Sequence, residues 1–436
     1  MIIRAIGLAG LLSIFAGGVD AQEAERTYWN AMNEGRYLEA LVLIEANLQN
    51  EMQNIPQEDV ERMQRDRMSQ IYSMLGRNDL VIRQFDITSE DNFEGYDSEP
   101  FEPVDAIAAI REAAADRRVL MINESHRDPR PRAFLSGLLQ GLREDGFTHF
   151  AAETFNGNDD MERLVSDGYP TQGIGYYTSE PYFGDLVRTA IRLGFQPARY
   201  EANEAIEAMA SCVDCDFMER IRMREKGQAE NLAAILDANP SARMVVFVGY
   251  DHLIETGDLD GDGQVNGLMG AEFKVLTGID PVTVDLVMFL GSESRYFLDE
   301  YEYLRSTYSV EHPVALRDSN GSWFSSRPEA TDMEIVNPVL SEGANGVPTW
   351  MSMNGYRQPF VIEQRRLPQE RPILVQAFVE AESELAIPMA QYLLLEDEFQ
   401  DVTLMMPAGS YRLVAQVSSG PDVDLGMAEI VTSPDP

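Results

Sequence analysis

Basic residues are scarce in this chain, which has 34 Lys and Arg against 73 Asp and Glu and a formal net charge of -39. An electrostatic field of this sign repels phosphate groups, so the composition argues against nucleic acid and anionic membrane surfaces as partners. Hydrophobic residues make up 44% of the 436 residues, which is ample for buried cores. The length predicts two or three domains.

Long apolar runs are absent except near the N-terminus. Residues 5–18 are apolar but short for a bilayer span, Arg4 precedes them, and a small-x-small cleavage pattern ends at Ala21. This order predicts a secretory signal peptide at residues 1–21, cleaved after Ala21, with a retained anchor as the alternative. We expect a periplasmic or secreted mature chain that has no membrane span.

The chain has only two cysteines, Cys212 and Cys215. In an exported protein, a pair at this spacing favours a local disulfide. A redox pair or half of a metal site is the alternative, but a zinc site of this type needs a second pair of ligands. The sequence has no second Cys pair, so we predict a structural disulfide.

Residues 22–90 are predicted to be helical, with a glycine turn in each of two similar units. Gly35 and Gly76 each follow a helical pattern rich in aromatic or apolar residues and precede a second one. These units resemble tetratricopeptide repeats, which implies a protein or peptide partner. The alternative is a helical cap on the next domain. An acidic linker is expected at residues 87–103.

Residues 104–295 alternate between apolar runs and segments of helical periodicity. The runs are residues 119–122, 148–152, 196–200, 244–249 and 282–289, and the helical segments are residues 104–115, 131–145, 184–193 and 216–238. This alternation predicts an α/β domain with a mostly parallel sheet and helices on both faces. Continuously apolar strands are typical of a sheet that is buried on both faces.

Glu or His follows four of these runs: Glu124 and His126, then Glu153, Glu201 and His252. Ligands of such sheets bind at the carboxyl ends of the strands, so we expect these side chains at one rim. Residues two apart on an extended chain point the same way, which places Glu124 beside His126. The alternative is a set of solvated loop ends, although two of the four histidines of the chain lie here.

A carboxylate beside an imidazole makes a general base for water. His126 is the candidate base, with Glu124 or Glu153 as its partner, and His252 is a second acid/base or a holder of an oxyanion. Arg224, on the helix before the His252 strand, would supply positive charge to that oxyanion.

The alternative for Arg224 is a surface ion pair with Glu225 or Glu219. His126 and His252, with the nearby carboxylates, are also candidate ligands of a divalent transition metal, with water completing the shell.

Four short motifs occur in order: Asn123-Glu-Ser-His126, Ala152-Glu153, Arg224-Glu-Lys-Gly-Gln-Ala-Glu-Asn231 and Gly249-Tyr-Asp-His252. Together, over residues 106–290, they resemble the superfamily of erythromycin esterase-like, ChaN-like haem-uptake and Tiki-like proteins. Asn123 stands where that superfamily usually has Gly. The resemblance implies a hydrolase with a histidine base, a metal-dependent protease or a haem-binding protein.

From these observations we expect hydrolysis of an ester or amide bond in a small molecule or peptide. One alternative is a non-enzymatic protein that binds haem or another small ligand, because Tyr can be an axial haem ligand and four tyrosines crowd one segment. They are Tyr169, Tyr176, Tyr177 and Tyr182. An aromatic lid over a substrate pocket would also explain them. A scaffold with an inactive site is a further alternative.

Residues 258–269 match part of a calcium-binding loop. Asp258, Asp260 and Asp262 occupy its first, third and fifth positions, Gly263 its sixth and Asn266 its ninth. Met269 stands at position twelve, where a bidentate acid is expected. We predict a calcium site here, with a plain acidic turn as the alternative.

The last part of the chain has two patterns. Residues 296–365 lack periodicity and are expected to form an irregular connection. Residues 366–436 alternate apolar and polar residues between turns, which predicts a small β-sandwich-like accessory domain.

Overall fold

The computed structural model describes residues 28–51, 67–84, 95–96, 100–155, 158–201, 212, 215–259, 265–291, 298–343 and 346–431. The expected signal peptide at residues 1–21 lies outside this part of the chain and stays a prediction. Within the described residues, every helix is too short or too polar to cross a membrane.

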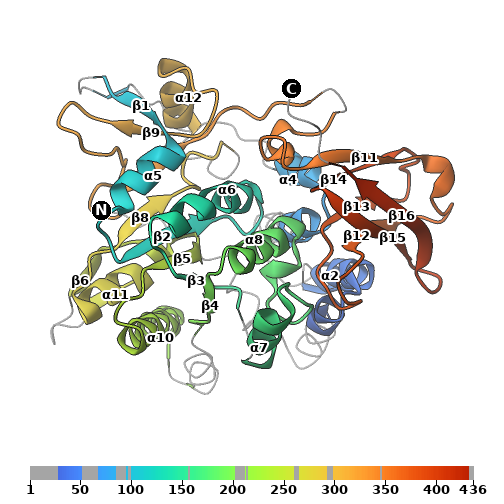
Figure 1. Ribbon diagram of the computed structural model, residues 1–436, viewed down its shortest axis with the longest axis horizontal. Helices are drawn as coiled ribbons and strands as arrows, with labels where there is room; N and C mark the ends of the chain where they lie inside the picture. The colour runs from blue at the N-terminus through green and yellow to red at the C-terminus, as the bar shows by residue number, and fades with distance from the viewer. Residues whose placement is uncertain are drawn as a thin grey trace.

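An eight-stranded sheet forms the centre of the α/β domain, in the order β1-β9-β10-β8-β2-β5-β3-β4 (Figure 1). Its parallel strands are β10 (Met333–Val336), β8 (Val282–Asp285), β2 (Val119–Glu124), β5 (Met244–Gly249), β3 (His149–Ala152) and β4 (Gln196–Ala198). At one edge, β9 (Val314–Arg317) and β1 (Glu102–Asp105) run antiparallel. The predicted mostly parallel sheet is therefore confirmed.

Helices cover both faces of this sheet, which explains why its central strands are apolar throughout. Leu120 and Ile122 of β2 face one core, and Val119 and Met121 face another. The first core also contains side chains of α5 (Ala106–Ala114), α6 (Arg130–Glu144) and α8 (Pro181–Arg192). The second contains side chains of α10 (Phe217–Ala238) and α11 (Met269–Thr277). Alternate residues of each strand thus bury in opposite layers.

The expected irregular connection at residues 296–365 is wrong where the chain forms regular elements, which occur in both halves of this range. Residues 298–307 form α12 (Leu298–Thr307), and β9 and β10 join the main sheet. These four-residue strands are too short to show a period in the sequence. The strand expected at residues 282–289 also ends early, because the Asp285 carboxylate accepts hydrogen bonds from the amides of Val287 and Met288.

The N-terminal units have the predicted helix–glycine–helix form. Residues 28–33 precede α2 (Tyr37–Glu51), and residues 67–74 precede α4 (Asn78–Gln84). Gly35 and Gly76 have φ angles of +71° and +76°, which favour glycine. Figure 1 shows these blue helices beside the red C-terminal strands, and their core includes Leu374 and Leu393. A partner for these helices stays a prediction.

The C-terminal region consists of two antiparallel sheets with one shared core. Strands β13 (Ala390–Leu394), β12 (Ile373–Val379), β15 (Gly409–Val417) and β16 (Val423–Ile430) form one sheet, and β11 (Gln358–Ile362) pairs with β14 (Val402–Met406) in the other. Their apolar side chains lie in a single cluster. The expected antiparallel β region is confirmed.

Candidate active site

Glu124 and His126 form a buried pair at the carboxyl end of β2. Glu124 is the last residue of the strand, and its Oε1 lies 2.7 Å from Nδ1 of His126. On the other side, Nε of Arg132 donates to Oε2 of Glu124 at 2.8 Å. A carboxylate accepts hydrogen bonds, so Nδ1 of His126 is the protonated nitrogen and Nε2 has the lone pair in the neutral ring.

The His126 ring fits a slot between aromatic side chains and the backbone of Gly249. Tyr177 stacks on it with ring centroids 3.8 Å apart and planes at 11°, and Tyr250 meets its edge at 5.0 Å. A Cβ atom at position 249 would lie only 2.7 Å from Nε2 of His126 and 2.9 Å from Oε2 of Glu153. Only glycine therefore fits this position without displacing the site.

Glu153, directly after β3, connects the two histidines. Its Oε2 accepts a hydrogen bond from the amide of Gly249 at 2.7 Å, and its Oε1 accepts one from Nη2 of Arg224 at 2.7 Å. Burial raises the pKa of Glu153, but the charges of His252, Arg224 and His126 outweigh burial and hold that pKa well below its usual range. Glu153 is thus a carboxylate at any physiological pH.

His252 lies in the turn η5 (Tyr250–Leu253) after β5, between two carboxylates. Its Nδ1 is 2.6 Å from Oε1 of Glu225, and its Nε2 is 3.8 Å from Oε1 of Glu153. Burial lowers the pKa of His252, but Glu225 and Glu153 outweigh burial and raise the pKa to about 9. At neutral pH, His252 is therefore an imidazolium, which can donate a proton or stabilise a developing negative charge but cannot accept a proton.

Arg224 is buried and donates to two carboxylates, so the alternative of a surface ion pair with Glu225 or Glu219 is wrong. Its Nε and Nη2 donate to Glu201 at 3.0 and 2.5 Å, and Nη2 also donates to Glu153. Glu225 faces His252, and Glu219 belongs to the cap of the helix. Glu201 accepts a further bond from Gln228 at 3.1 Å. This network places Arg224 behind Glu153.

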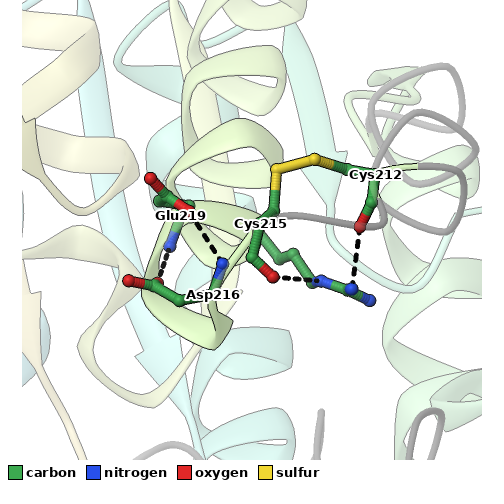
Figure 2. The surroundings of a disulfide bond; sticks show 5 residues. Cys212, Cys215, Asp216 and Glu219 are labelled. Carbon is green, nitrogen blue, oxygen red and sulfur yellow. Dashed lines mark hydrogen bonds between the residues drawn. A yellow bond between two sulfur atoms is a disulfide. The ribbon is translucent and has the colours of Figure 1, made fainter.

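A disulfide lies at the start of the helix that bears Arg224 and Glu225 (Figure 2). Cys212 and Cys215 are bonded, as predicted from the sequence. Arg220 donates to the carbonyl oxygens of Cys212 and Cys215 at 2.8 and 3.3 Å. The Asp216 side chain and the Glu219 side chain each accept a backbone amide of the other, which forms a capping box.

The Asn123 side chain connects the end of β2 to the segments at the ends of β5 and β8. Its side-chain amide donates to the carbonyl of Tyr250 and to Oδ1 of Asp285, each at 2.9 Å. Its Oδ1 accepts the amide of Leu286 at 2.7 Å. Tyr250 has a φ angle of +44°, so this bond holds a backbone conformation that non-glycine residues seldom adopt.

Of the four tyrosines expected to crowd one loop, Tyr176 and Tyr177 contact each other with ring centroids 5.2 Å apart, whereas Tyr169 and Tyr182 make other contacts. Of the four, Tyr177 contacts His126, and Tyr176 packs on Trp29 with ring centroids 4.4 Å apart. Tyr169 accepts the amide of Ser383, and Tyr182 donates to the carbonyl of Met351 at 3.3 Å. Of these four side chains, only Tyr177 packs against the ring of His126. Haem binding stays a prediction.

The described residues contain no group of three His, Cys, Asp or Glu side chains arranged as metal ligands. Both oxygens of Glu153 already accept hydrogen bonds, and one oxygen of Glu124 faces Arg132. A metal at His126 and His252 would require these partners to move, so we assign no chemical step to one. The transition-metal alternative stays a prediction.

The centre of the predicted calcium loop, residues 260–264, falls outside the described residues. Asp258 lies in β6 (Gly257–Leu259) and Asn266 in β7 (Val265–Gly267), which pair as antiparallel strands. Asp260 and Asp262 lie in residues 260–264, which the structure does not describe. Calcium binding stays a prediction.

Comparison with known proteins does not assign the chain to a family. No family model and no curated protein matches it. Nine chains of solved structures match it. The type III effector HopBA1 is 11% identical with a TM-score of 0.31, over 56% of this chain and 99% of that chain.

RRSP, a MARTX toxin effector domain from Vibrio vulnificus, is 14% identical with a TM-score of 0.32, over 61% of this chain and 55% of that chain. The Pasteurella multocida toxin, whose C-terminal region has a thiol-protease like catalytic triad, is 10% identical with a TM-score of 0.30. That match covers 71% of this chain and 46% of the toxin chain. At these scores the comparisons assign neither fold family nor activity.

Proposed function

We propose that this protein hydrolyses an ester or amide bond in a small molecule or peptide. One observation above all supports the proposal. Glu153, a buried carboxylate, lies between a histidine whose Nδ1 faces Glu124 and a second histidine whose pKa is raised to about 9. A histidine oriented by a carboxylate and a second histidine held as an imidazolium, both beside one carboxylate, are the parts that general base and general acid catalysis require.

In this scheme, neutral His126 accepts a proton from water through Nε2. Glu124 orients the ring and stabilises the imidazolium that forms, because it accepts the Nδ1 proton at 2.7 Å. The hydroxide attacks the carbonyl carbon, and the His252 imidazolium stabilises the oxyanion and then protonates the leaving alcohol or amine. Glu225 and Glu153 keep His252 charged, and Arg224 holds Glu153 in place.

The resemblance to erythromycin esterase-like proteins, which the comparisons do not test, agrees with this chemistry. A panel of chromogenic esters and fluorogenic peptides would test it with wild type, His126→Ala and His252→Gln. The matched control is His312→Ala, because His312 is exposed in a loop. We expect both site variants to lose at least about 100-fold in kcat/KM, the typical contribution of a general acid or base, and the control to retain wild-type activity.

Turnover of a substrate by wild type that survives in His126→Ala would contradict the proposal. Metal analysis of the purified protein separates the metal-dependent alternative, since about one transition metal per chain that disappears in His126→Ala would favour it. Absorbance in the Soret region after addition of hemin, with no turnover of any ester or peptide, would favour the haem-binding alternative.

A further inference from the structure

A fully buried arginine lies behind the Glu124–His126 pair. Arg132, in the first turn of α6, places Nε 2.8 Å and Nη2 2.7 Å from the same oxygen of Glu124, Oε2. Its Nη1 lies 3.3 Å from Oε2 of Glu180. The guanidinium also lies over the ring of Phe183, 5.1 Å from the centroid. Arg132 therefore connects Glu124 to the start of α8.

Glu180 is itself rigidly held, because it caps the N-terminus of α8. Its Oε1 accepts the amide of Tyr182 at 3.0 Å, and its Oε2 accepts the amide of Phe183 at 2.9 Å. Burial raises the pKa of Glu180, and the charge of Arg132 and these amides act against that rise. The N-terminus of α8 thus holds Glu180, which is the first member of a series of side-chain contacts that runs through Arg132 and Glu124 to His126.

The geometry limits what Glu124 can do. Two donors of Arg132 occupy Oε2, so Oε1 alone is directed at Nδ1 of His126. The two charge-assisted hydrogen bonds of the guanidinium fix the position of Oε2, and the contact of Oε1 with Nδ1 of His126 fixes the other end of the carboxylate. With Nδ1 committed as donor, Nε2 is the nitrogen left to accept a proton, and it lies near Gly249 and Glu153.

We propose that Arg132 is a positioning residue, supported by Glu180, which holds Glu124 so that His126 stays in the tautomer with Nε2 free to accept a proton. The inference rests on the proposed function, in which His126 is the base. It concerns two buried residues, Arg132 and Glu180, that the sequence motifs do not include.

The test is ¹⁵N NMR of the histidine rings, because the chain has only four histidines and single variants assign them. The decisive variant is Arg132→Met with Glu180→Gln. It removes the guanidinium and one carboxylate together, so the cluster of Glu124, Glu180 and Arg132 keeps its formal charge of one negative unit. We expect wild type to show His126 as the single tautomer protonated on Nδ1, and the double variant to show a mixture of tautomers at the same pH.

A matched control removes a second fully buried arginine whose partner also lies in α8. Arg357 donates to Asp185 at 2.6 Å. The variant Arg357→Met with Asp185→Asn disturbs the fold in the same way and should leave the His126 signals unchanged. On a substrate of the wild type, the Arg132 double variant should lose about tenfold or more in kcat, as orienting partners of catalytic or metal-bound histidines typically do, while KM changes little.

A single wild-type tautomer in the folded Arg132 double variant would overturn the proposal, and so would an equal change in the Arg357 control. If the double variant does not fold, Arg132→Lys decides, because an ammonium cannot reproduce the fork on Glu124. A wild-type tautomer ratio in that variant would also overturn the proposal. The NMR signals do not depend on turnover, so this outcome is independent of whether the protein is a hydrolase.

Discussion

Replacing Gly249 with alanine would test the contact geometry of the site with one methyl group. Gly249 has a φ angle of -76°, so alanine adopts its backbone conformation without strain. The new Cβ would lie 2.7 Å from Nε2 of His126 and 2.9 Å from Oε2 of Glu153, against ordinary contacts of 3.4–4 Å. Cε1 of His126 would lie closer still, at 2.4 Å, so both side chains must move unless the backbone at position 249 shifts.

The His126 ring has little room for this movement. Tyr177 stacks on it at 3.8 Å, and Glu124 and Arg132 fix the other end of the ring. Inserting a methyl group into such packing typically costs about 1–3 kcal/mol of unfolding free energy. A displacement of about 1 Å in a catalytic group can cost about 100-fold in rate, so we expect kcat/KM to fall by about 10- to 100-fold.

Urea denaturation measures the stability effect, and hydrolysis of the best substrate measures the activity effect. Gly137→Ala is the control, because Gly137 is exposed in α6 and a Cβ there meets nothing within 4 Å. That variant should gain about 0.5–1 kcal/mol through helix propensity and keep full activity. If Gly249→Ala behaved like this control in both assays, the close approach of Gly249 to His126 would be refuted.

Three further predictions concern charge, the disulfide and calcium. The pKa of His252 is raised to about 9, so the contribution of its charge to stability is complete below pH 6.5 and declines as the pH rises to 9. The total decline is about 3 kcal/mol at most. In urea denaturation at several pH values, His252→Gln should show a flatter dependence of unfolding free energy on pH than wild type. A slope equal to that of wild type would contradict the imidazolium assignment. Replacing Cys212 and Cys215 with serine should lower the unfolding free energy by about 2 kcal/mol, and a reductant should destabilise only the wild type; equal stability of the two proteins would count against a structural role. Millimolar calcium should raise the melting temperature of wild type but not of a variant with Asp260→Ala and Asp262→Ala, and an unchanged wild type would sink the calcium prediction.

Local pattern was enough to predict most of the α/β domain. The apolar runs that became β2 and β5 are continuous because helices bury both faces of those strands, and such runs are visible without an alignment. The polar residues that follow them were predicted to share one rim, and His126 and His252 both lie beside Glu153. The turns at Gly35 and Gly76 were predictable because each needs a positive φ angle.

Short strands and distant partners were not predictable. Strands β9 and β10 are four residues each, which is less than the length over which a period can be recognised. Strand β9 pairs with β1 and β10 pairs with β8, and in both cases the partner strand is distant in the sequence. Arg132 and Glu180 lie at helix starts, where charged residues are common, so nothing in the sequence separates them from surface residues. Their burial against Glu124 depends on how α6 and α8 pack on the sheet.

The sequence by itself determined which side chains leave the carboxyl ends of the strands, because that depends only on strand period and parallel connection. Only the tertiary structure decided what each side chain does. His252 is an imidazolium because Glu225, on a different element, lies 2.6 Å away, and Arg224 holds Glu153 because α10 packs beside β3 and Glu201. Protonation depends on charges within a few ångströms in space, and those neighbours are far apart along the chain.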